Sequence, residues 1–266
     1  MISVIICVYK KDCPVLFRKS LNSVFNQSLL PSEVVLCIDG ELTKELTLVV
    51  SDFSKKNKLI VVKNKQSLGH GQARMVALKK TTNNIVAVAD SDDISRFNRF
   101  KIQYEFLLSN KVSIVGSSIQ EFSGDLLLNK RVVPVSHDNI IKFAKYRCPF
   151  NQMTVMFRKE DVMSVGGYVD FFNNEDYFLW YRLIKSGFKL ANVSNILVDA
   201  HVNLEFIKRR RGWKYYKSEI KLKKIFYKDG FINRFDYLFQ VIIRFVFQII
   251  LSEKILKLIY NKWLRK

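Results

Sequence analysis

The sequence has few of the features that mark secreted, zinc-binding or membrane-spanning proteins. Its four cysteines include no Cys-x-x-Cys pair and no other metal-ligand spacing, so a reducing cytoplasm fits better than a disulfide framework. No run reaches the roughly 18–20 uncharged apolar residues that a transmembrane helix needs. The first apolar stretch, 2–8, is too short for a signal peptide, and lysines follow it instead of preceding it.

Negative charge is also scarce. The 266 residues include 44 Lys and Arg against 24 Asp and Glu, a net charge of +20, and this excess favours an anionic partner such as nucleic acid, anionic lipid or a phosphorylated substrate. Residues 205–266 alone contain 17 Lys and Arg but only 5 Asp and Glu. This last quarter therefore carries +12 and is predicted to be a separate functional region. The hydrophobic fraction of 48% still indicates a folded protein.

One apolar run ends abruptly in acid. Ile85–Ala89 has the length of a buried strand, and Asp90, Asp92 and Asp93 follow it directly. Residues two apart in an extended chain point to the same side, so Asp90 and Asp92 can converge on one ligand, and Mg²⁺ or Mn²⁺ prefers such oxygen ligands. The competing interpretation is a solvated turn in which Asp92 and Asp93 cap a helix that starts near Ser95.

Strand-like and helix-like segments alternate through the first half of the chain. The predicted strands are Ser3–Tyr9, Glu33–Ile38, Leu59–Lys63 and the run before Asp90, and the predicted helices are Val15–Gln27, about Leu42–Lys56 and a segment that runs from loop 66–71 to Lys80. This alternation predicts an α/β fold with a Rossmann-like, mostly parallel central sheet and helices on both faces. In such sheets ligands bind at the carboxyl ends of the strands, where Asp39 and the acidic cluster both fall.

The second half changes character. Its predicted elements are a helix over Phe97–Leu108, a strand over Val112–Ile119, an irregular hairpin over Glu121–Pro134, a strand over Gln152–Phe157, a helix over Asn174–Leu183, and strands over Lys189–Val193 and Ile196–Ala200. The helix has Glu175 and Asp176 at its N-terminus, where the helix dipole favours negative charge. We see no repeat and no linker, so positions 1–204 are predicted to form one compact domain.

Six segments follow one another at a characteristic spacing. They are Ser3–Tyr9, Asp39, Gly69 with Ala73-Arg74, Asp90-Ser91-Asp92-Asp93, Gly166-Gly167-Tyr168, and Glu175-Asp176 followed by Leu179-Trp180-x-Arg182. Together they resemble the GT-A-fold, family 2 glycosyltransferases of bacterial surface-polysaccharide assembly, over roughly residues 1–200. Three positions depart from the pattern: Cys7 stands where proline is common, Asp39 is single where a pair is frequent, and Met75 stands where asparagine is usual. These departures bear on the loop around the donor base and ribose.

The resemblance implies a metal-dependent, inverting glycosyltransferase. Residues 1–204 would form the GT-A domain, with a nucleotide-sugar-binding half at 1–115 and an acceptor half at 116–204. The donor would be a nucleotide sugar, in particular a UDP-sugar, and the acceptor a lipid-linked saccharide of capsule, exopolysaccharide or O-antigen synthesis. Residues 205–266 would form a basic, amphipathic helical tail. Its Arg209-Arg210-Arg211-Gly212 run, with Tyr215 and Glu219, is similar to the tail of the family members that build capsule, exopolysaccharide or O-antigen repeat units.

The resemblance also implies roles for individual residues. The donor-binding residues would be Val8, Tyr9, Asp39, Gly69, Arg74, Asp90, Ser91 and Asp93. Asp92 would be the main ligand of Mn²⁺ or Mg²⁺, with Asp90 and His201 as further candidates; a lone His is more often a surface residue. Arg74 would reach the donor phosphates or hold Asp39. Asp176 would be the general base and Glu175 would orient it or the acceptor, unless the two form only a charge pair at a helix N-terminus.

The tail has an apolar stretch, Phe235–Leu251, interrupted by a polar residue at every fourth position. These polar residues are Asp236, Gln240, Arg244, Gln248 and Ser252, and they share one narrow stripe of a helix. Such a helix either packs into the protein or lies in a membrane interface. Flanking cations, including Lys208, Arg209, Lys254 and Lys257, favour the anionic inner face of the cytoplasmic membrane, with Trp263 at the interface.

Two further hypotheses compete with the enzyme. A non-catalytic nucleic-acid-binding protein would account for the +20 charge, but it would carry cations interleaved with exposed aromatic residues across the fold, and no recognition motif is present. A degenerate sugar-binding module would have lost the acids, and they are intact. We therefore expect an enzyme with a metal cofactor, without a nucleic-acid partner, located in the cytoplasm and peripherally on the membrane.

Overall fold

The computed structural model describes residues 1–56, 58–202 and 210–251. The strands are β1 (Ile2–Val8), β2 (Glu33–Asp39), β3 (Leu59–Asn64), β4 (Ile85–Asp90), β5 (Ile94–Ser95), β6 (Ile114–Ser123), β7 (Leu126–Arg131), β8 (Met156–Arg158) and β9 (Leu190–His201). The helices are α1 (Pro14–Phe25), α2 (Lys44–Lys56), α3 (His70–Lys80), α4 (Arg99–Ser109), α5 (His137–Ala144), α6 (Lys159–Ser164), α7 (Glu175–Lys185), α9 (Trp213–Lys228) and α10 (Arg234–Phe245). Two short turns of helix complete them: η1 (Gln152–Thr154) and η2 (Val246–Ile250).

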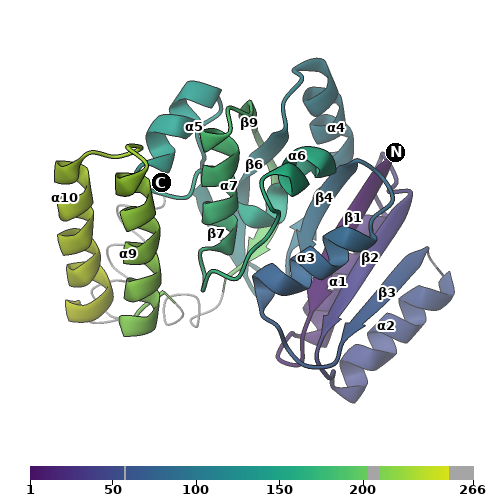
Figure 1. Ribbon diagram of the computed structural model, residues 1–266. Coiled ribbons are helices and arrows are strands. Elements are labelled where there is room, and N and C mark those ends of the chain that lie inside the picture. Colours follow the sequence, from purple (N-terminus) through teal and green to yellow (C-terminus); the bar gives the residue numbers. More distant parts are fainter. Residues whose placement is uncertain (57, 203–209, 252–266) are drawn as a thin grey trace.

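All strands belong to one sheet, whose order is β3-β2-β1-β4-β8-β6-β9-β5, with β7 paired to β6 (Figure 1). The first four strands in this order are parallel, as the alternation of strands and helices predicts. β8 runs antiparallel to both of its neighbours, β4 and β6, and β6 and β9 are again parallel. The predicted α/β fold class is therefore confirmed, and every antiparallel pair includes at least one strand that comes after β5.

Helices cover both faces of the sheet, and each face has its own core. Side chains of α1, α2 and α4 pack on one face, with Phe17, Leu46 and Phe100 among them. Side chains of α3, α6 and α7 pack on the other, with Ala77 and Trp180 among them. Successive strand residues point to opposite faces, which is why the central strands, buried on both sides, read as continuous apolar runs.

Several predicted elements of the second half were wrong in detail. The segment predicted as a strand over 152–157 begins as the 3-10 turn η1, because the Thr154 hydroxyl donates to the carbonyl of Asn151 at 2.8 Å. Helix α5 was missed, although Ser136 caps it by accepting a hydrogen bond from the amide of Asn139. The two strands predicted over 189–200 are one strand, β9, whose pairing with β6 shifts register beside Ser118.

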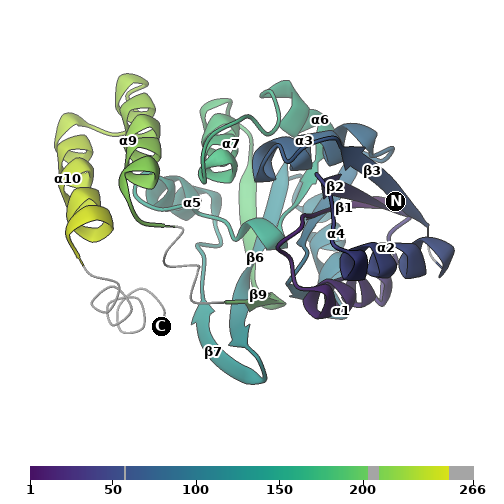
Figure 2. The ribbon, with the colours of Figure 1, turned by 90° about the horizontal axis from the view of Figure 1, so that it is seen from below.

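Helices α9 and α10 extend the molecule beyond α7, and α10 is outermost in both views (Figures 1 and 2). An apolar cluster joins α9 to α7: Tyr177 and Tyr181 of α7 pack against Leu222 and Phe226 of α9. The predicted boundary at 204/205 and the cations Lys208, Arg209 and those from 254 onward lie outside the described residues. The helices on either side of that boundary share a core.

Helix α10 packs with its polar side inward. Gln240 is 2% exposed and Gln248, in η2, is 7% exposed, while Phe235 is 87% and Ile242 64% exposed. The buried Gln248 amide donates to Glu219 of α9 at 2.6 Å, and Arg244 also pairs with Glu219. The predicted polar stripe is thus real, but it is the stripe that faces the protein. None of the helices in the described parts of the chain is both long and apolar enough to cross a membrane.

Candidate active site

A cavity of about 870 Å³ opens where the carboxyl ends of β1, β2 and β4 face the N-terminus of α7 and helices α9 and α10. It brings together every residue to which the sequence analysis gave a catalytic, donor-binding or metal-binding role. These are Val8, Tyr9, Asp39, Gly69, Arg74, Asp90, Ser91, Asp92, Asp93, Glu175, Asp176 and His201. Parallel strands place their carboxyl ends on one edge of the sheet, which explains the convergence of positions so far apart in the chain. The roles assigned to these residues remain predictions.

The acidic cluster is partly buried and hydrogen-bonded, unlike a solvated turn. Asp93 is only 5% exposed, and its carboxylate accepts a hydrogen bond from the backbone amide of His201 at 2.8 Å. Burial, then the nearby Asp92 and Asp90, raise the pKa of Asp93 well above its usual range. Helix α4 begins only at Arg99 and has Asn98 at its N-cap position. The interpretation in which Asp92 and Asp93 cap this helix is therefore wrong.

Arg74 binds one carboxylate of each acidic motif, and its second partner, Glu175, lies 101 positions further along the chain. One guanidinium nitrogen lies 3.0 Å from Asp90 and another lies 3.0 Å from Glu175. The side chain is 10% exposed, so both ion pairs are largely shielded from water. The expectation that Arg74 holds Asp39 is wrong, because the carboxylates it binds are those of β4 and α7. Arg74 fixes these two acids relative to each other, as charge-assisted contacts of a planar guanidinium do.

Asp39 organises the loop between β3 and α3. Its carboxylate accepts hydrogen bonds from the side chains of Asn64 (2.9 Å) and Ser67 (2.7 Å) and from the backbone amides of Leu68 (2.8 Å) and Gly69 (3.0 Å). Although burial opposes its charge, these bonds lower the pKa of Asp39. Gly69 has a φ of +86°, a conformation that favours glycine and aims its amide at Asp39.

The two acids of α7 have different surroundings. Burial and the adjacent Asp176 raise the pKa of Glu175 to about 7 despite Arg74. Asp176 is half-buried and lies beside the thiol of Cys148, whose Sγ is 4.0 Å from its carboxylate. Gly71 of α3 allows this arrangement, because a Cβ there would come within 3.0 Å of the Glu175 side chain.

The sequence reasoning missed Asp12. Its carboxylate accepts hydrogen bonds from the amide of Tyr9 at 3.0 Å and from the hydroxyl of Ser91 at 2.8 Å, so it lies directly beside the acidic cluster and lines the same cavity. Burial raises the pKa of Asp12 to about 6. The available signal was an aspartate three residues after Tyr9, at the end of the predicted strand. At that spacing its side chain can accept a hydrogen bond from the backbone of Tyr9. The cavity also contains Arg131, Arg147 and Arg244, which no motif indicated, and Arg210 and Arg211 from the arginine run that the sequence analysis singled out.

The acid end of the cavity suits a divalent cation that shares its shell with a substrate. Asp92 Oδ2 lies 3.5 Å from His201 Nδ1, which places the carboxylate beside the imidazole as predicted. Burial and then Asp90 raise the pKa of Asp92, so a cation would relieve unfavourable negative charge here. Within the described ranges, no group of three or more His, Cys, Asp or Glu residues has metal-binding geometry. Asp92 and His201 would thus act as two ligands, completed by diphosphate oxygens, as is common for Mg²⁺.

Comparison with known proteins places this cavity in a family context. The family model described as glycosyl transferase family 2 matches residues 3–167. The chain is 34% identical to the UDP-Gal:alpha-D-GlcNAc-diphosphoundecaprenol beta-1,3-galactosyltransferase of Escherichia coli over 268 residues, which cover 99% of this chain and 96% of that protein.

Solved structures share the fold at low sequence identity. The S. aureus TarS 1-349 complex with UDP-GlcNAc has a TM-score of 0.68 and 18% identity, over 92% of this chain and 72% of that one. The mannosyltransferase PcManGT from Pyrobaculum calidifontis, in complex with GDP-Man and Mn²⁺, has a TM-score of 0.65 and 15% identity, over 94% of this chain and 70% of that one. These likenesses confirm the predicted GT-A fold.

Proposed function

The chain belongs to glycosyl transferase family 2 and is a glycosyltransferase, and from this premise we propose that it moves a sugar from a UDP-sugar to a lipid-linked, diphosphate-bearing saccharide. The expectation of an enzyme is confirmed, so the non-catalytic alternatives are set aside. The E. coli relative, which acts on GlcNAc-diphosphoundecaprenol, supports both the donor and the acceptor class. The expected surface-polysaccharide subgroup is supported by a second relative, the amylovoran biosynthesis glycosyltransferase AmsE of Erwinia amylovora, which is 34% identical over 88% of this chain and 89% of that protein.

The observation that carries the proposal is the double ion pair of Arg74. It holds the acids at the end of β4 and the acids at the start of α7 on two sides of one cavity, 3.0 Å from each carboxylate. Transfer of a sugar needs a site for the leaving diphosphate and a base for the acceptor hydroxyl, both fixed in line with the anomeric carbon. Two acidic motifs whose relative position is fixed by one arginine meet that requirement.

Within this arrangement Asp176 acts as the general base. Glu175 is committed to Arg74 and so serves as a positioning residue, while Asp176 extends from the first turn of α7 into the cavity. The acceptor hydroxyl gives its proton to the Asp176 carboxylate as its oxygen forms the new bond to the anomeric carbon. The bond from that carbon to the diphosphate breaks on the opposite side, and the nucleoside diphosphate leaves. A single displacement of this kind inverts the configuration of the anomeric carbon.

Asp92 and His201 would hold a divalent cation, and Asp90, which pairs with Arg74, would be a further candidate ligand. When bound, Mn²⁺ or Mg²⁺ supplies positive charge that stabilises the leaving diphosphate. Asp39 supports the donor side differently, since its four hydrogen bonds keep the 64–69 loop against the cavity.

Replacement of the base tests this function. Asp176→Asn should lower kcat by about 10²–10⁴-fold, the usual contribution of a general base, and leave the Kd for UDP with Mn²⁺ unchanged. Asp170→Asn, an exposed acid just before α7, is the matched control and should keep full activity. An Asp176→Asn enzyme with undiminished transfer, or with weakened UDP binding, would show that Asp176 is not the base.

We further infer that the outer face of α10 binds the cytoplasmic surface of the membrane, where the acceptor lipid lies. The inference rests on the exposure of Phe235 (87%), Phe239 (59%) and Ile242 (64%) on a helix whose Gln240 is buried against the protein. An apolar helical face of this kind partitions into the headgroup region of a bilayer. The many cations of the tail favour anionic lipid.

Vesicle co-sedimentation tests the membrane surface. The protein should bind vesicles that contain phosphatidylglycerol and bind pure phosphatidylcholine much less. Because each buried Phe or Ile contributes about 1.5–3 kcal/mol, Phe235→Ser with Ile242→Ser should weaken binding about 10²-fold. Leu48→Ser, an equally exposed residue on the distant α2, is the control. Equal binding by the double variant and the wild type would refute the assignment of α10.

A further inference from the structure

Arginines line the side of the cavity that β7, the end of α5, α9 and α10 form. They are Arg131, Arg147, Arg210, Arg211 and Arg244. In the described part of this side, the carboxylates that line the cavity and are not bound to Arg74 are Asp176 and Glu219. Glu219 already pairs with Arg244. Among the described residues that line this side of the cavity, arginines therefore outnumber carboxylates.

Three of these cations crowd together next to the predicted base. Burial and then the neighbouring Arg210 and Arg147 lower the pKa of Arg131, and Asp176 acts on it in the opposite direction. Arg131 donates to the carbonyl of Cys148 at 3.4 Å, and the thiol of Cys148 lies 4.0 Å from Asp176. Like charges brought together in a partly buried place repel one another, and a bound anion removes that cost.

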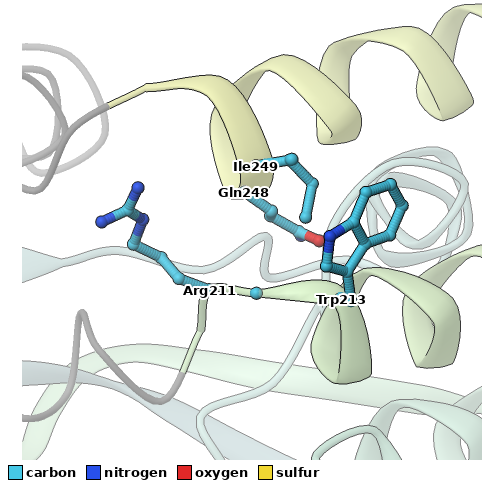
Figure 3. Close-up of a pocket in the computed structure, with 5 residues that line it drawn as sticks. Arg211, Trp213, Gln248 and Ile249 are labelled. Carbon is cyan, nitrogen blue, oxygen red and sulfur yellow. The ribbon is translucent and has the colours of Figure 1, made fainter.

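The chain next to Arg210 is hydrogen-bonded to η2 and to the residue that follows it. The amide of Gly212 donates to the carbonyl of Gln248 at 3.1 Å, and Arg211 donates to the carbonyl of Leu251. Figure 3 shows Arg211 directed away from Trp213 at a small pocket of about 330 Å³ that Gln248 and Ile249 complete. These hydrogen bonds fix the conformation of residues 211–212, next to Arg210, against the rest of the protein.

Aromatic and apolar side chains also line the cavity. Tyr146, Tyr215, Phe239, Ile243 and Phe247 line it, and the last three belong to α10 and η2. The cavity therefore combines a carboxylate, a group of guanidinium ions and an apolar wall, and Phe239 of that wall is also part of the exposed face of α10.

We propose that Arg131, Arg147 and Arg210 form a subsite for the diphosphate of a lipid-linked acceptor. The proposal rests on the proposed function and deepens it, because a carboxylate, guanidinium ions and an apolar wall in one cavity match an acceptor sugar, its diphosphate and its hydrocarbon chain. Guanidinium groups bind phosphate oxygens in a bidentate way, which suits a diphosphate. The apolar wall then receives the first units of the lipid.

The donor diphosphate is the other ligand with this chemistry, and position argues against it. The donor diphosphate belongs beside Asp92 and His201, at the end of β4. The arginines instead adjoin Asp176, because Arg131 donates to the Cys148 carbonyl and the Cys148 thiol lies beside Asp176. A general base lies beside the acceptor hydroxyl, so an anion site next to it suits the acceptor.

Calorimetric binding of farnesyl diphosphate, farnesyl monophosphate and farnesol, all in EDTA, tests the subsite on the full chain. The wild type should bind farnesyl diphosphate most tightly. Arg131→Gln and Arg147→Gln should each weaken that binding about tenfold, which corresponds to about 1.4 kcal/mol, and Arg131→Gln with Arg210→Gln more. Binding of UDP with Mn²⁺ should stay within about twofold. Lys142→Gln, an exposed cation on α5, is the matched control, and Arg131→Lys should recover part of the loss.

Each other outcome decides against the subsite. Equal wild-type affinity for farnesyl diphosphate and farnesol would mean that only the apolar wall binds. A parallel loss of UDP affinity would assign the arginines to the donor. Arg147 is exposed, so its variant remains informative even if Arg131→Gln fails to fold. If the wild type binds farnesyl diphosphate through these arginines but transfers no sugar from any UDP-sugar, the proposed function fails and the subsite stands.

Discussion

Asp39→Asn separates the structural role of this residue from its charge. Asparagine has nearly the same shape but one accepting oxygen, and four donors surround the carboxylate. In the better amide orientation the oxygen faces Asn64 and Leu68, and the NH₂ faces Ser67 and Gly69. The Ser67 hydroxyl can turn and accept, but the Gly69 amide cannot, so one partly buried donor loses its partner.

The size of the effect follows from these contacts. A hydrogen bond to a charged group contributes about 1.5–3 kcal/mol, and the bonds that remain fall to neutral strength. The free energy of unfolding should therefore decrease by about 2–4 kcal/mol at pH 7. The pKa of Asp39 is lowered in the folded protein, so its contribution is present above the unfolded value of about 3.9 and is lost as pH falls through the lower folded value. The difference between variant and wild type should shrink below about pH 4.

Urea unfolding at neutral and acidic pH measures this difference. Asp125→Asn, an exposed acid in the β6–β7 turn, controls for the loss of one charge and should change stability by less than about 0.5 kcal/mol. Affinity for UDP should fall in Asp39→Asn, because the loop it holds lines the cavity. A variant as stable as the wild type at pH 7, or a loss of stability that persists unchanged in acid, would contradict this account.

Three further predictions concern packing, the C-terminal helix and the metal. Gly116→Ala should lower stability by about 2–3 kcal/mol, since a Cβ would lie 2.3 Å from the amide oxygen of Asn192; equilibrium unfolding measures it. Glu219→Ala should cost about 3–5 kcal/mol, because Arg244 and Gln248 lose a buried acceptor, and limited proteolysis should then cut α10 sooner. EDTA should abolish sugar transfer and Mn²⁺ restore it, with no change in the urea midpoint of the free protein; transfer that survives chelation would contradict the metal assignment.

Local sequence patterns predicted the first half of the fold within one or two residues of each boundary. The strands there are buried on both faces and the helices are amphipathic, so the apolar period alone identifies them. The second half was less predictable, because short strands such as β8 depend on their neighbours. Residues 152–154 have a strand-like composition, but the hydrogen bonds of Thr154 to the 151 carbonyl and the 117 amide bend the chain into a turn.

The helix α10 shows the limit of pattern reasoning most clearly. The repeat of polar residues at every fourth position predicted an amphipathic helix, and the helix exists. The pattern does not say which side faces the protein. That depends on the partner surface, where Glu219 of α9 offers a buried carboxylate to Arg244 and Gln248. The polar side therefore packs inward and leaves the apolar side exposed.

By itself, the sequence determined the α/β class, the family and the residues that converge on the cavity, because strand ends and short acidic motifs are local features with local causes. Tertiary structure alone decided the partners. Arg74 and Glu175 are 101 positions apart, and Arg131, Arg147 and Arg210 come from three separate segments. Coulomb energy depends on distance in space, and distance in space between remote segments is set only when the sheet and its helices pack.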